Sequence, residues 1–295
     1  MKKLDKSNYG YLFILPFFIV FLIFSLYPMV YTFYLSFYSW DGMSTPAFVG
    51  AQNFDRVITD EVFRIALVNT VRIWLVNFIP QMGVALLLAG IFTFNKIKGM
   101  NFFRSVFYLP NLVTAASIGV LFNLFFQGDN SVVNSFLVQT GILEQPFSFF
   151  ASPTFTSNLV SYTQWWMWFG YTLIIVMAGM TTIDHGLYEA AQIDGATKFQ
   201  IFSKITLPLI RPTMMFLTLT SVMGGMQIFD VPATLTDGLG SPQRSILTVA
   251  MYIYNTGFRN FNMGYAAALS ISLFAIVAVL TMIYFFIMNR RRKSQ

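Results

Sequence analysis

The sequence predicts an all-α integral membrane protein that crosses the bilayer six times. Composition is the first reason, because 56% of the 295 residues are hydrophobic and only 10% are charged, whereas soluble domains carry about 25% charged residues. Length is the second, because the apolar residues form long runs, and a helix needs roughly 20 of them to cross a bilayer core of about 30 Å. A β-barrel requires short alternating strands, which these runs do not show.

The predicted spans are separated by polar or turn-forming segments. In chain order they are Tyr11–Phe37, Ile73–Phe94, Val106–Phe126, Leu159–Thr181, Leu207–Phe229 and Tyr265–Met288. The first run, 11–37, is too long for the core of a signal peptide and no small-residue cleavage site follows it, so we expect it to be retained. Residues 1–295 are therefore predicted to form a single transmembrane domain, with core spans within about 66–288.

The distribution of Lys and Arg predicts the orientation of the spans. Most of the 18 basic residues fall on one side, namely Lys2, Lys3, Lys6, Lys96, Lys98, Arg104, Lys198, Lys204, Arg211, Arg290, Arg291, Arg292 and Lys293. Loops rich in basic residues stay in the cytoplasm. Both termini and the loop after the fourth span are therefore predicted to be cytoplasmic.

Several function classes are disfavoured by what the chain lacks. It has no cysteine, so a disulfide framework and a cysteine-based metal site are absent, and the single histidine, His185, makes no multi-histidine site. The net charge is +6, but the basic residues lie at the ends of apolar runs and are not clustered among aromatic residues on a soluble face. This distribution argues against nucleic acid as a partner. No G-x-x-x-x-G-K-[ST] motif is present, so this chain has no P-loop for ATP.

Glu189–Pro212, between the fourth and fifth predicted spans, carries the strongest functional signal. Gly195 interrupts its helical pattern, and Phe199, Phe202 and Ile205 then follow at three-residue spacing, which predicts one apolar stripe of a second helix. We expect a helix, a turn and a helix outside the bilayer, covered by another protein. An ordinary connector, whose acid and glycine only cap and terminate helices, is the simpler alternative.

This stretch resembles the EAA signature of the membrane subunits of bacterial ATP-binding-cassette (ABC) importers. The general signature is matched by Glu189, Ala190, Ala191, Gly195, Ile205, Leu207 and Pro208, and the form found in carbohydrate importers (maltose- and glycerol-phosphate-like) also by Asp194, Ala196 and Phe202. In that family the loop is a coupling helix that docks into a cleft on the ATPase subunit. The resemblance implies an ATPase-coupling role for the loop 182–206 and its flank, through Glu189, Ala190, Ala191, Asp194, Gly195, Phe199, Phe202, Leu207 and Pro208.

Shorter similarities to carbohydrate-type permeases extend over nearly the whole chain. They are Leu26-Tyr27-Pro28 in the first span, Phe48-Val49-Gly50 and Asn53-Phe54 in the first outer loop, and Phe103-Arg104-Ser105 with Leu109-Pro110 at the third span. Two long outer loops, Gln127–Ser157 and Asp230–Met263, contain turn residues. In a binding-protein-dependent importer, the loaded receptor would dock on such loops.

Candidate substrate contacts lie on the fourth and fifth predicted spans. A sugar needs aromatic faces for its C–H surface and amides or hydroxyls for its OH groups. Gln164, Trp168 and Tyr171 recur at a spacing that places them on one face of a helix, and Gln227 and Asp230 lie at the outer end of the fifth span. By resemblance to the maltose-type permease, Trp168, Tyr171 and Gln227 are sugar-facing.

Other residues of the spans also permit a structural interpretation. Trp165 and Trp166 fit an aromatic belt at the membrane interface as well as they fit a sugar site. Asn77, Gln81 and Asn123 are rarer candidates for substrate contact, and we expect each to bond a neighbouring helix instead.

The resemblance implies a multi-pass permease in the bacterial cytoplasmic (inner) membrane, acting in an ABC importer for a mono- or oligosaccharide or a related polyol. Its expected partners are the lipid bilayer, a second permease of different sequence, two ATPase subunits and an extracytoplasmic solute-binding protein. ATP and Mg²⁺ are expected in the ATPase subunits. This chain is therefore expected to have no cofactor, metal site or catalytic residue, and not to be an enzyme.

Three alternatives differ in cargo or in class. An ABC permease for an amino acid, a peptide or a phosphate ester keeps the coupling loop and changes the solute. A secondary carrier or channel working alone is disfavoured, because no Asp, Glu or Lys lies near the middle of a span and no internal repeat is evident. A membrane enzyme is disfavoured by the lack of paired intramembrane carboxylates or a nucleophile motif.

Overall fold

A computed structural model describes residues 9–95, 97–236 and 238–292. These residues are mostly helical and fall into two compact units. The first unit lies within Met1–Glu61 and Ile253–Ile276, and the second within Val62–Tyr252 and Val277–Gln295. Lys2, Lys3, Lys6, Lys96 and Lys293, whose charges contribute to the predicted orientation, lie outside the described residues.

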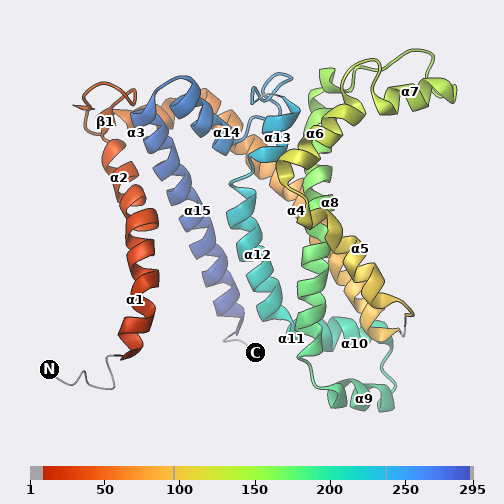
Figure 1. Cartoon of the computed structure of the whole chain (residues 1–295). Coiled ribbons are helices and arrows are strands. Elements are labelled where there is room, and N and C mark those ends of the chain that lie inside the picture. Colours follow the sequence, from red (N-terminus) through yellow and green to blue (C-terminus); the bar gives the residue numbers. More distant parts are fainter. Residues whose placement is uncertain (1–8, 96, 237, 293–295) are drawn as a thin grey trace. The chain divides into compact units, whose positions relative to one another are not determined.

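The first unit begins with a long apolar helix, drawn in red in Figure 1. α1 (Tyr9–Phe21), a π-helical turn η2 (Leu22–Leu26) and α2 (Tyr27–Leu35) follow one another without a gap. The wider turn ends two residues before Pro28, which has no N–H to donate to the helix. β1 (Tyr38–Ser39) and β2 (Ala47–Phe48) then form a short antiparallel hairpin that pairs Tyr38 with Phe48.

Side-chain hydrogen bonds hold the rest of the first unit together. Asn53, in α3 (Gln52–Thr59), donates from Nδ2 to the Tyr38 carbonyl oxygen at 2.9 Å. Tyr265, in α15 (Met263–Arg292), is fully buried and donates its hydroxyl hydrogen bond to the carboxylate of Asp60. The outer loop predicted around Asn53 is therefore an ordered element that includes a helix.

The second unit contains the helices that build the candidate site. They are α4 (Glu61–Phe94), α5 (Met100–Leu112), α6 (Ala115–Phe126), α7 (Val132–Gln139), η3 (Phe149–Ala151), α8 (Pro153–Thr181), α9 (His185–Ile193), α10 (Lys198–Ile201), η4 (Phe202–Thr206), α11 (Leu207–Leu209), α12 (Arg211–Gly225), α13 (Asp230–Leu235) and α14 (Val249–Tyr254), with the last part of α15. One apolar core gathers around Ala89 of α4 and Leu173 of α8. A second joins Ile118 of α6, Val160 of α8 and Val231 of α13.

Within the described residues, four segments are each long and apolar enough to cross a membrane, namely Tyr11–Leu35, Glu61–Phe94, Arg211–Leu235 and Met263–Met288. The number rises to six if two bent pairs, Met100–Leu112 with Ala115–Phe126 and Pro153–Thr181 with His185–Ile193, each form one span. The predicted helical architecture with several apolar spans is confirmed. Six spans, cytoplasmic termini and a single domain stay predictions.

Several predicted boundaries are wrong. The third span, Val106–Phe126, is interrupted, because Val113 is extended and the Thr114 side chain caps a new helix, so that α5 and α6 meet at 90°. The second span begins at Glu61 instead of Ile73. The fifth, Leu207–Phe229, is helical only in parts, because α12 ends at the glycine pair Gly224-Gly225. The long outer loops contain the short helices α7, α13 and α14.

The two ends of the second unit carry different features. α9 and α10 lie at one end, and α6, α7 and α13 at the other (Figure 1). Arg211, at the start of α12, donates from Nη2 to the Met288 carbonyl oxygen at 2.8 Å. The last turns of α15 therefore lie at the same end as the loop 182–206, in agreement with the orientation argument.

Candidate functional site

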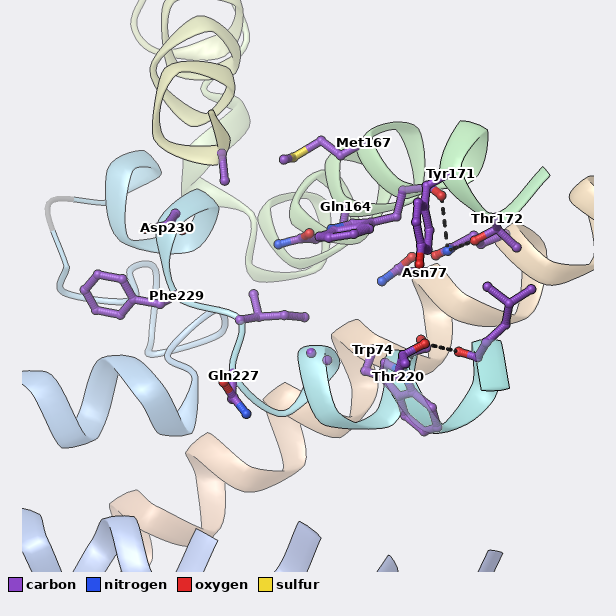
Figure 2. Close-up of a pocket in the computed structure, with 18 residues that line it drawn as sticks. Trp74, Asn77, Gln164, Met167, Tyr171, Thr172, Thr220, Gln227, Phe229 and Asp230 are labelled. Carbon is purple, nitrogen blue, oxygen red and sulfur yellow. Dashed lines mark hydrogen bonds between the residues drawn. The ribbon is translucent and has the colours of Figure 1, made fainter. Parts of the chain in front are cut away.

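The second unit contains a cavity of about 320 Å³, whose lining is drawn in Figure 2. The lining residues are Trp74, Asn77 and Gln81 of α4, Ala115 of α6, Gln164, Met167, Trp168, Tyr171 and Thr172 of α8, Leu217, Thr220, Ser221, Gly224 and Gly225 of α12, and the segment Gln227, Ile228, Phe229 and Asp230. Amides, hydroxyls and aromatic rings predominate, and Asp230 is the one charged residue among them. This volume is at the lower end of the roughly 300–1,000 Å³ typical of small-molecule sites.

The five main candidates for substrate contact, Gln164, Trp168, Tyr171, Gln227 and Asp230, all line this cavity. Gln164, Trp168 and Tyr171 come from successive turns of α8, and the rings of Trp168 and Tyr171 meet edge to face with centroids 5.9 Å apart. Gln227 lies in the irregular segment after α12, and Asp230 begins α13. Their convergence agrees with the predicted shared face, while their contact with a substrate stays a prediction.

Trp74 of α4 and Ser221 of α12 also line the cavity, and neither was predicted from the sequence. Trp74 Nε1 donates to Ser221 Oγ at 3.0 Å. A Cβ added at Gly225 would come within 2.0 Å of Trp74 Cδ1, so the indole packs directly on the helix backbone. The sequence signal was the glycine pair Gly224-Gly225, because a glycine inside a helix costs about 1 kcal/mol relative to alanine and often marks a close approach to the backbone.

Two of the three polar residues expected to bond neighbouring helices do so. Gln81 Nε2 donates to Thr172 Oγ1 at 2.6 Å, and Asn123 Nδ2 donates to the Leu235 carbonyl oxygen at 3.2 Å. Asn77 differs: it is only 5% exposed, and its Oδ1 has no hydrogen-bond partner among the described residues. The expectation of a helix–helix bond is therefore wrong for Asn77, which lines the cavity instead.

Trp165 and Trp166 pack within the unit. Trp165 stacks on Phe169 with ring centroids 5.5 Å apart, and Trp166 meets Phe122 of α6 edge to face at 6.0 Å. Both are half-buried, and neither lines the cavity. Both therefore contribute to helix packing, and their place in an interfacial aromatic belt stays a prediction.

The helix α9 opens the candidate coupling loop and ends at a glycine. Gly195 has φ +79°, its N–H bonds to the Gln192 carbonyl oxygen, and the N–H of Ala196 bonds to that of Ala191. This pair of bonds is the Schellman termination, which favours glycine because other side chains disfavour left-handed backbone. The predicted turn at Gly195 is confirmed.

Hydrogen bonds join the second half of the loop to its surroundings. Thr197 caps α10 in a capping box with Gln200. The buried hydroxyl of Tyr188 in α9 lies 3.2 Å from Thr206 Oγ1 in η4, which ties the two helical parts together. The loop therefore has a defined conformation within this single chain.

The predicted apolar stripe of Phe199, Phe202 and Ile205 is wrong. The chain changes from α10 to the π-helical turn η4 at Phe202, so three-residue spacing does not keep the side chains on one face. Phe202 and Ile205 pack against the core, whereas Phe199 is 76% exposed. Ile193 is also exposed, at 86%.

The remaining candidate coupling residues differ in exposure. Glu189, Ala190, Asp194 and Pro208 are exposed, while Ala191 and Leu207 are half-buried against the core. Among the described residues, no group of three or more His, Cys, Asp or Glu is placed to hold a metal ion. The loop thus offers a surface of charged and apolar side chains rather than a chemical centre.

Residues 71–293 match the family described as the inner membrane component of binding-protein-dependent transport systems. The chain belongs to this family. It is 34% identical over 284 residues to the lactose transport system permease protein LacF of Rhizobium radiobacter, covering 96% of this chain and 95% of that protein. It is 32% identical over 280 residues to the arabinooligosaccharides transport system permease protein AraP of Bacillus subtilis (strain 168), covering 95% and 88%.

A solved structure shares the fold of this permease family member. One chain of a bacterial alginate ABC transporter, crystallised with an alginate pentasaccharide-bound periplasmic protein, matches with a TM-score of 0.82 and 25% identity over 97% of this chain and 96% of that one. The resemblance drawn from the EAA stretch is therefore confirmed. The chain is a membrane component of a binding-protein-dependent transport system and not an enzyme.

Proposed function

We propose that this permease moves a sugar, either a mono- or oligosaccharide or a related polyol, across the bacterial cytoplasmic membrane as one subunit of an ABC importer. The observation that carries the proposal is the cavity of about 320 Å³ lined by amides, hydroxyls and aromatic rings. Relatives named for lactose and for arabinooligosaccharides support the same class of cargo.

The lining suits the two surfaces of a sugar. Trp168 and Tyr171 offer aromatic faces and edges to its C–H groups, and Gln164 and Gln227 offer amides that can both donate and accept hydrogen bonds. Asp230, at the rim, accepts only. A solute that filled this space would form hydrogen bonds with the amides and hydroxyls of the lining. A ligand with many hydroxyl groups can do so.

The coupling loop would receive the movement of the ATPase. Glu189 is exposed and is proposed to meet a basic group there, while the exposed side chains of Ile193 and Phe199 would be covered by the same partner. Exposed apolar side chains that gather in one place commonly mark an interaction site. ATP and Mg²⁺ would be held by two separate ATPase subunits.

The movement would reach the cavity through packed helices. Phe202 packs on Gly90 of α4, and Lys198 Nζ donates to Asn95 Oδ1 just beyond the end of α4 at 2.8 Å. The same helix carries Trp74 and Asn77 at the cavity. A shift of the loop would therefore tilt α4 together with α8 and α12, switching the cavity between inward- and outward-facing states by rigid-body rocking.

Further partners complete the proposed assembly. A second permease of different sequence would supply the other half of the pathway, and the solute-binding protein would deliver cargo at the end of the unit that carries α7 and α13. The large apolar side chains exposed along α1 and α2, such as Phe13 at 84%, would face lipid or that second permease.

The first experiment is a mild-detergent pull-down of the tagged chain from its native host, with mass spectrometry of the chains that co-purify. The test variant carries Glu189→Gln and Gly195→Val. The matched control carries Glu144→Gln and Gly141→Val, which change an exposed acid and a glycine at φ +73° in the loop beyond α7. We expect an ATPase and a second permease with the wild type and the control, and loss of the ATPase from the test variant.

Uptake measurements complete the test. Deletion of the gene should abolish binding-protein-dependent uptake of at least one sugar from a panel of radiolabelled lactose, arabinotriose and maltotriose, and re-expression should restore it. Recovery of the chain alone, or uptake that persists without any ATPase, would instead favour a carrier that works by itself. Restoration of amino acid or phosphate-ester uptake only would change the cargo and keep the class.

A further inference from the structure

Asn77 of α4 is an unpaired amide in the interior of the second unit. The residue is 5% exposed, and no group in the described part of the chain bonds to its Oδ1. A buried amide normally satisfies its bonds: Asn134, for example, donates to the carbonyl oxygens of Gly128 and Phe147 at 3.0 Å and accepts from the Phe147 N–H at 2.9 Å. An unpaired buried polar group destabilises the fold, so its retention here requires an explanation.

The cavity supplies that explanation. Asn77 lines it beside Gln164, which is 6% exposed and likewise has no side-chain hydrogen bond to another described residue. Figure 2 shows both amides beside the open space between α8, α12 and the segment 226–230. One turn farther along α4, Gln81 is bonded to Thr172. Among the buried Asn and Gln side chains of the described residues, the two without a side-chain hydrogen bond, Asn77 and Gln164, both line the cavity.

We propose that Asn77 is a specificity-determining contact for an uncharged sugar, pairing its amide with two neighbouring hydroxyls of the ligand. This inference rests on the proposed function and deepens it. An amide donates through Nδ2 and accepts through Oδ1, which matches a pair of sugar hydroxyls, one accepting and one donating. A half-turn about the Cβ–Cγ bond presents either end to the cavity, since the two ends are similar in shape.

Charge in the lining selects against anionic ligands. Among the described residues that line the cavity there is no Lys, Arg or His, and Asp230 adds a negative charge. A carboxylate, sulfonate or phosphate moved from water into this space would lose hydration without a cation to replace it. The fold-related transporter imports alginate, an acidic polysaccharide. This permease shares the fold of that transporter. Because the described lining of its cavity lacks a cation, we expect its cargo to be neutral rather than acidic.

Asn77→Leu distinguishes an effect on sugar affinity from an effect on the stability of the fold. Leucine has a similar size and no polar atom, so the variant removes the unpaired amide and should leave the melting temperature of the purified subunit unchanged or raise it. The matched control is Asn123→Leu, which removes a bonded amide that does not line the cavity. This control should lower the melting temperature and leave sugar affinity unchanged.

Binding is measured on the complete transporter in lipid nanodiscs by equilibrium dialysis with radiolabelled lactose, arabinotriose and trigalacturonate. We expect a neutral sugar to bind the wild type, Asn77→Leu to weaken its binding about tenfold, and trigalacturonate to bind at least tenfold more weakly than the neutral sugar. Unchanged affinity in Asn77→Leu, or trigalacturonate binding as tight as that of the neutral sugars, would overturn the inference while leaving sugar import intact. If cells that express the chain took up no more sugar than cells that lack it, the proposed function itself would be wrong.

Discussion

The phenyl ring of Phe202 lies against the bare backbone of Gly90. A Cβ added to Gly90 would come within 3.0 Å of Phe202 Cε2, a distance that real Cβ atoms rarely adopt. Phe202 belongs to the coupling loop and Gly90 to α4, which carries Asn77 and Trp74 at the cavity. One continuous helix therefore joins the loop to the cavity wall.

Gly90→Val should uncouple the loop from the cavity. The added methyl groups would displace the Phe202 ring, because packed interiors do not absorb extra volume without shifts of side chains or backbone, which typically cost about 1–3 kcal/mol. We expect sugar-stimulated ATP hydrolysis and uptake to fall together by roughly tenfold, while the subunit still inserts. Reconstituted transporter in proteoliposomes gives both rates.

Gly83→Val is the matched control for this prediction. Gly83 lies on the same helix, and nothing lies within 4 Å of a Cβ added there. Both substitutions change helix propensity equally, so a general weakening of α4 would affect both variants alike. Equal losses of uptake in the two variants would contradict the specific role of the contact between Phe202 and Gly90.

Gly195→Val tests the turn between the two helices of the coupling loop. Valine in the left-handed region costs roughly 1–2 kcal/mol, and the φ of +79° leaves the chain no unstrained alternative while the Schellman bonds persist. We expect ATP hydrolysis to continue and uptake to be lost. Gly195→Asn should retain most uptake, because asparagine tolerates left-handed backbone far better than β-branched residues do. Similar uptake in the two variants would argue against the turn as the cause.

The features of the fold that could be predicted are those determined by a few neighbouring residues in the sequence. Long apolar runs and Gly195 with its flanking residues carry their information within a few positions, so the helical architecture with several apolar spans and the turn at Gly195 were predicted correctly. The break at Val113 and Thr114 was missed, because an uninterrupted apolar run conceals a capping threonine inside it. The π-helical turn at Phe202 was missed because a period of about three or four residues was assumed throughout.

The sequence predicted the residues that line the α8 side of the cavity, but not the contribution of Asn77 from α4. Helical spacing placed Gln164, Trp168 and Tyr171 on one face of α8, and that face does line the cavity. Asn77 was expected to bond another helix, since nothing in its neighbouring sequence distinguishes it from Gln81, which does. The difference depends on which residue of α8 lies opposite, and this is a property of tertiary packing.

The loop before β2 should respond to pH through Asp41. Hydrogen bonds from the N–H groups of Ser44 and Met43, and from the Ser44 hydroxyl, lower the pKa of this carboxyl to about 2. The unfolded value is about 3.9, so the carboxylate favours the turn fully above about pH 4, and this contribution is lost as the pH falls toward 2.

Trp40 reports on this turn, because its Nε1 donates to the Ser44 carbonyl oxygen at 2.7 Å. The ¹⁹F resonance of 5-fluorotryptophan at position 40, assigned with Trp40→Phe, should therefore shift between about pH 4 and pH 2. Asp41→Asn should remove the shift. A shift of the same midpoint and size in Asp41→Asn would mean that another group titrates.

Phe199→Ala should weaken assembly with the ATPase. The Phe199 side chain is 76% exposed on the short helix α10, so truncating it removes no core packing from this chain and should leave its melting temperature unchanged. Exposed aromatic residues that a partner covers often contribute more than 1 kcal/mol to binding. A loss of about 1.4 kcal/mol on truncation would raise the dissociation constant about tenfold.

Phe136→Ala is the control that distinguishes docking from general surface hydrophobicity. Phe136 is 62% exposed on α7, at the opposite end of the second unit from α10, so this variant should bind the ATPase as the wild type does. Titration of the purified ATPase onto permease in nanodiscs measures both dissociation constants. Equal affinities of the Phe199→Ala variant and the wild type would mean that the ATPase does not cover this ring. The acidic surface around Glu189 would then have to provide the docking contact alone.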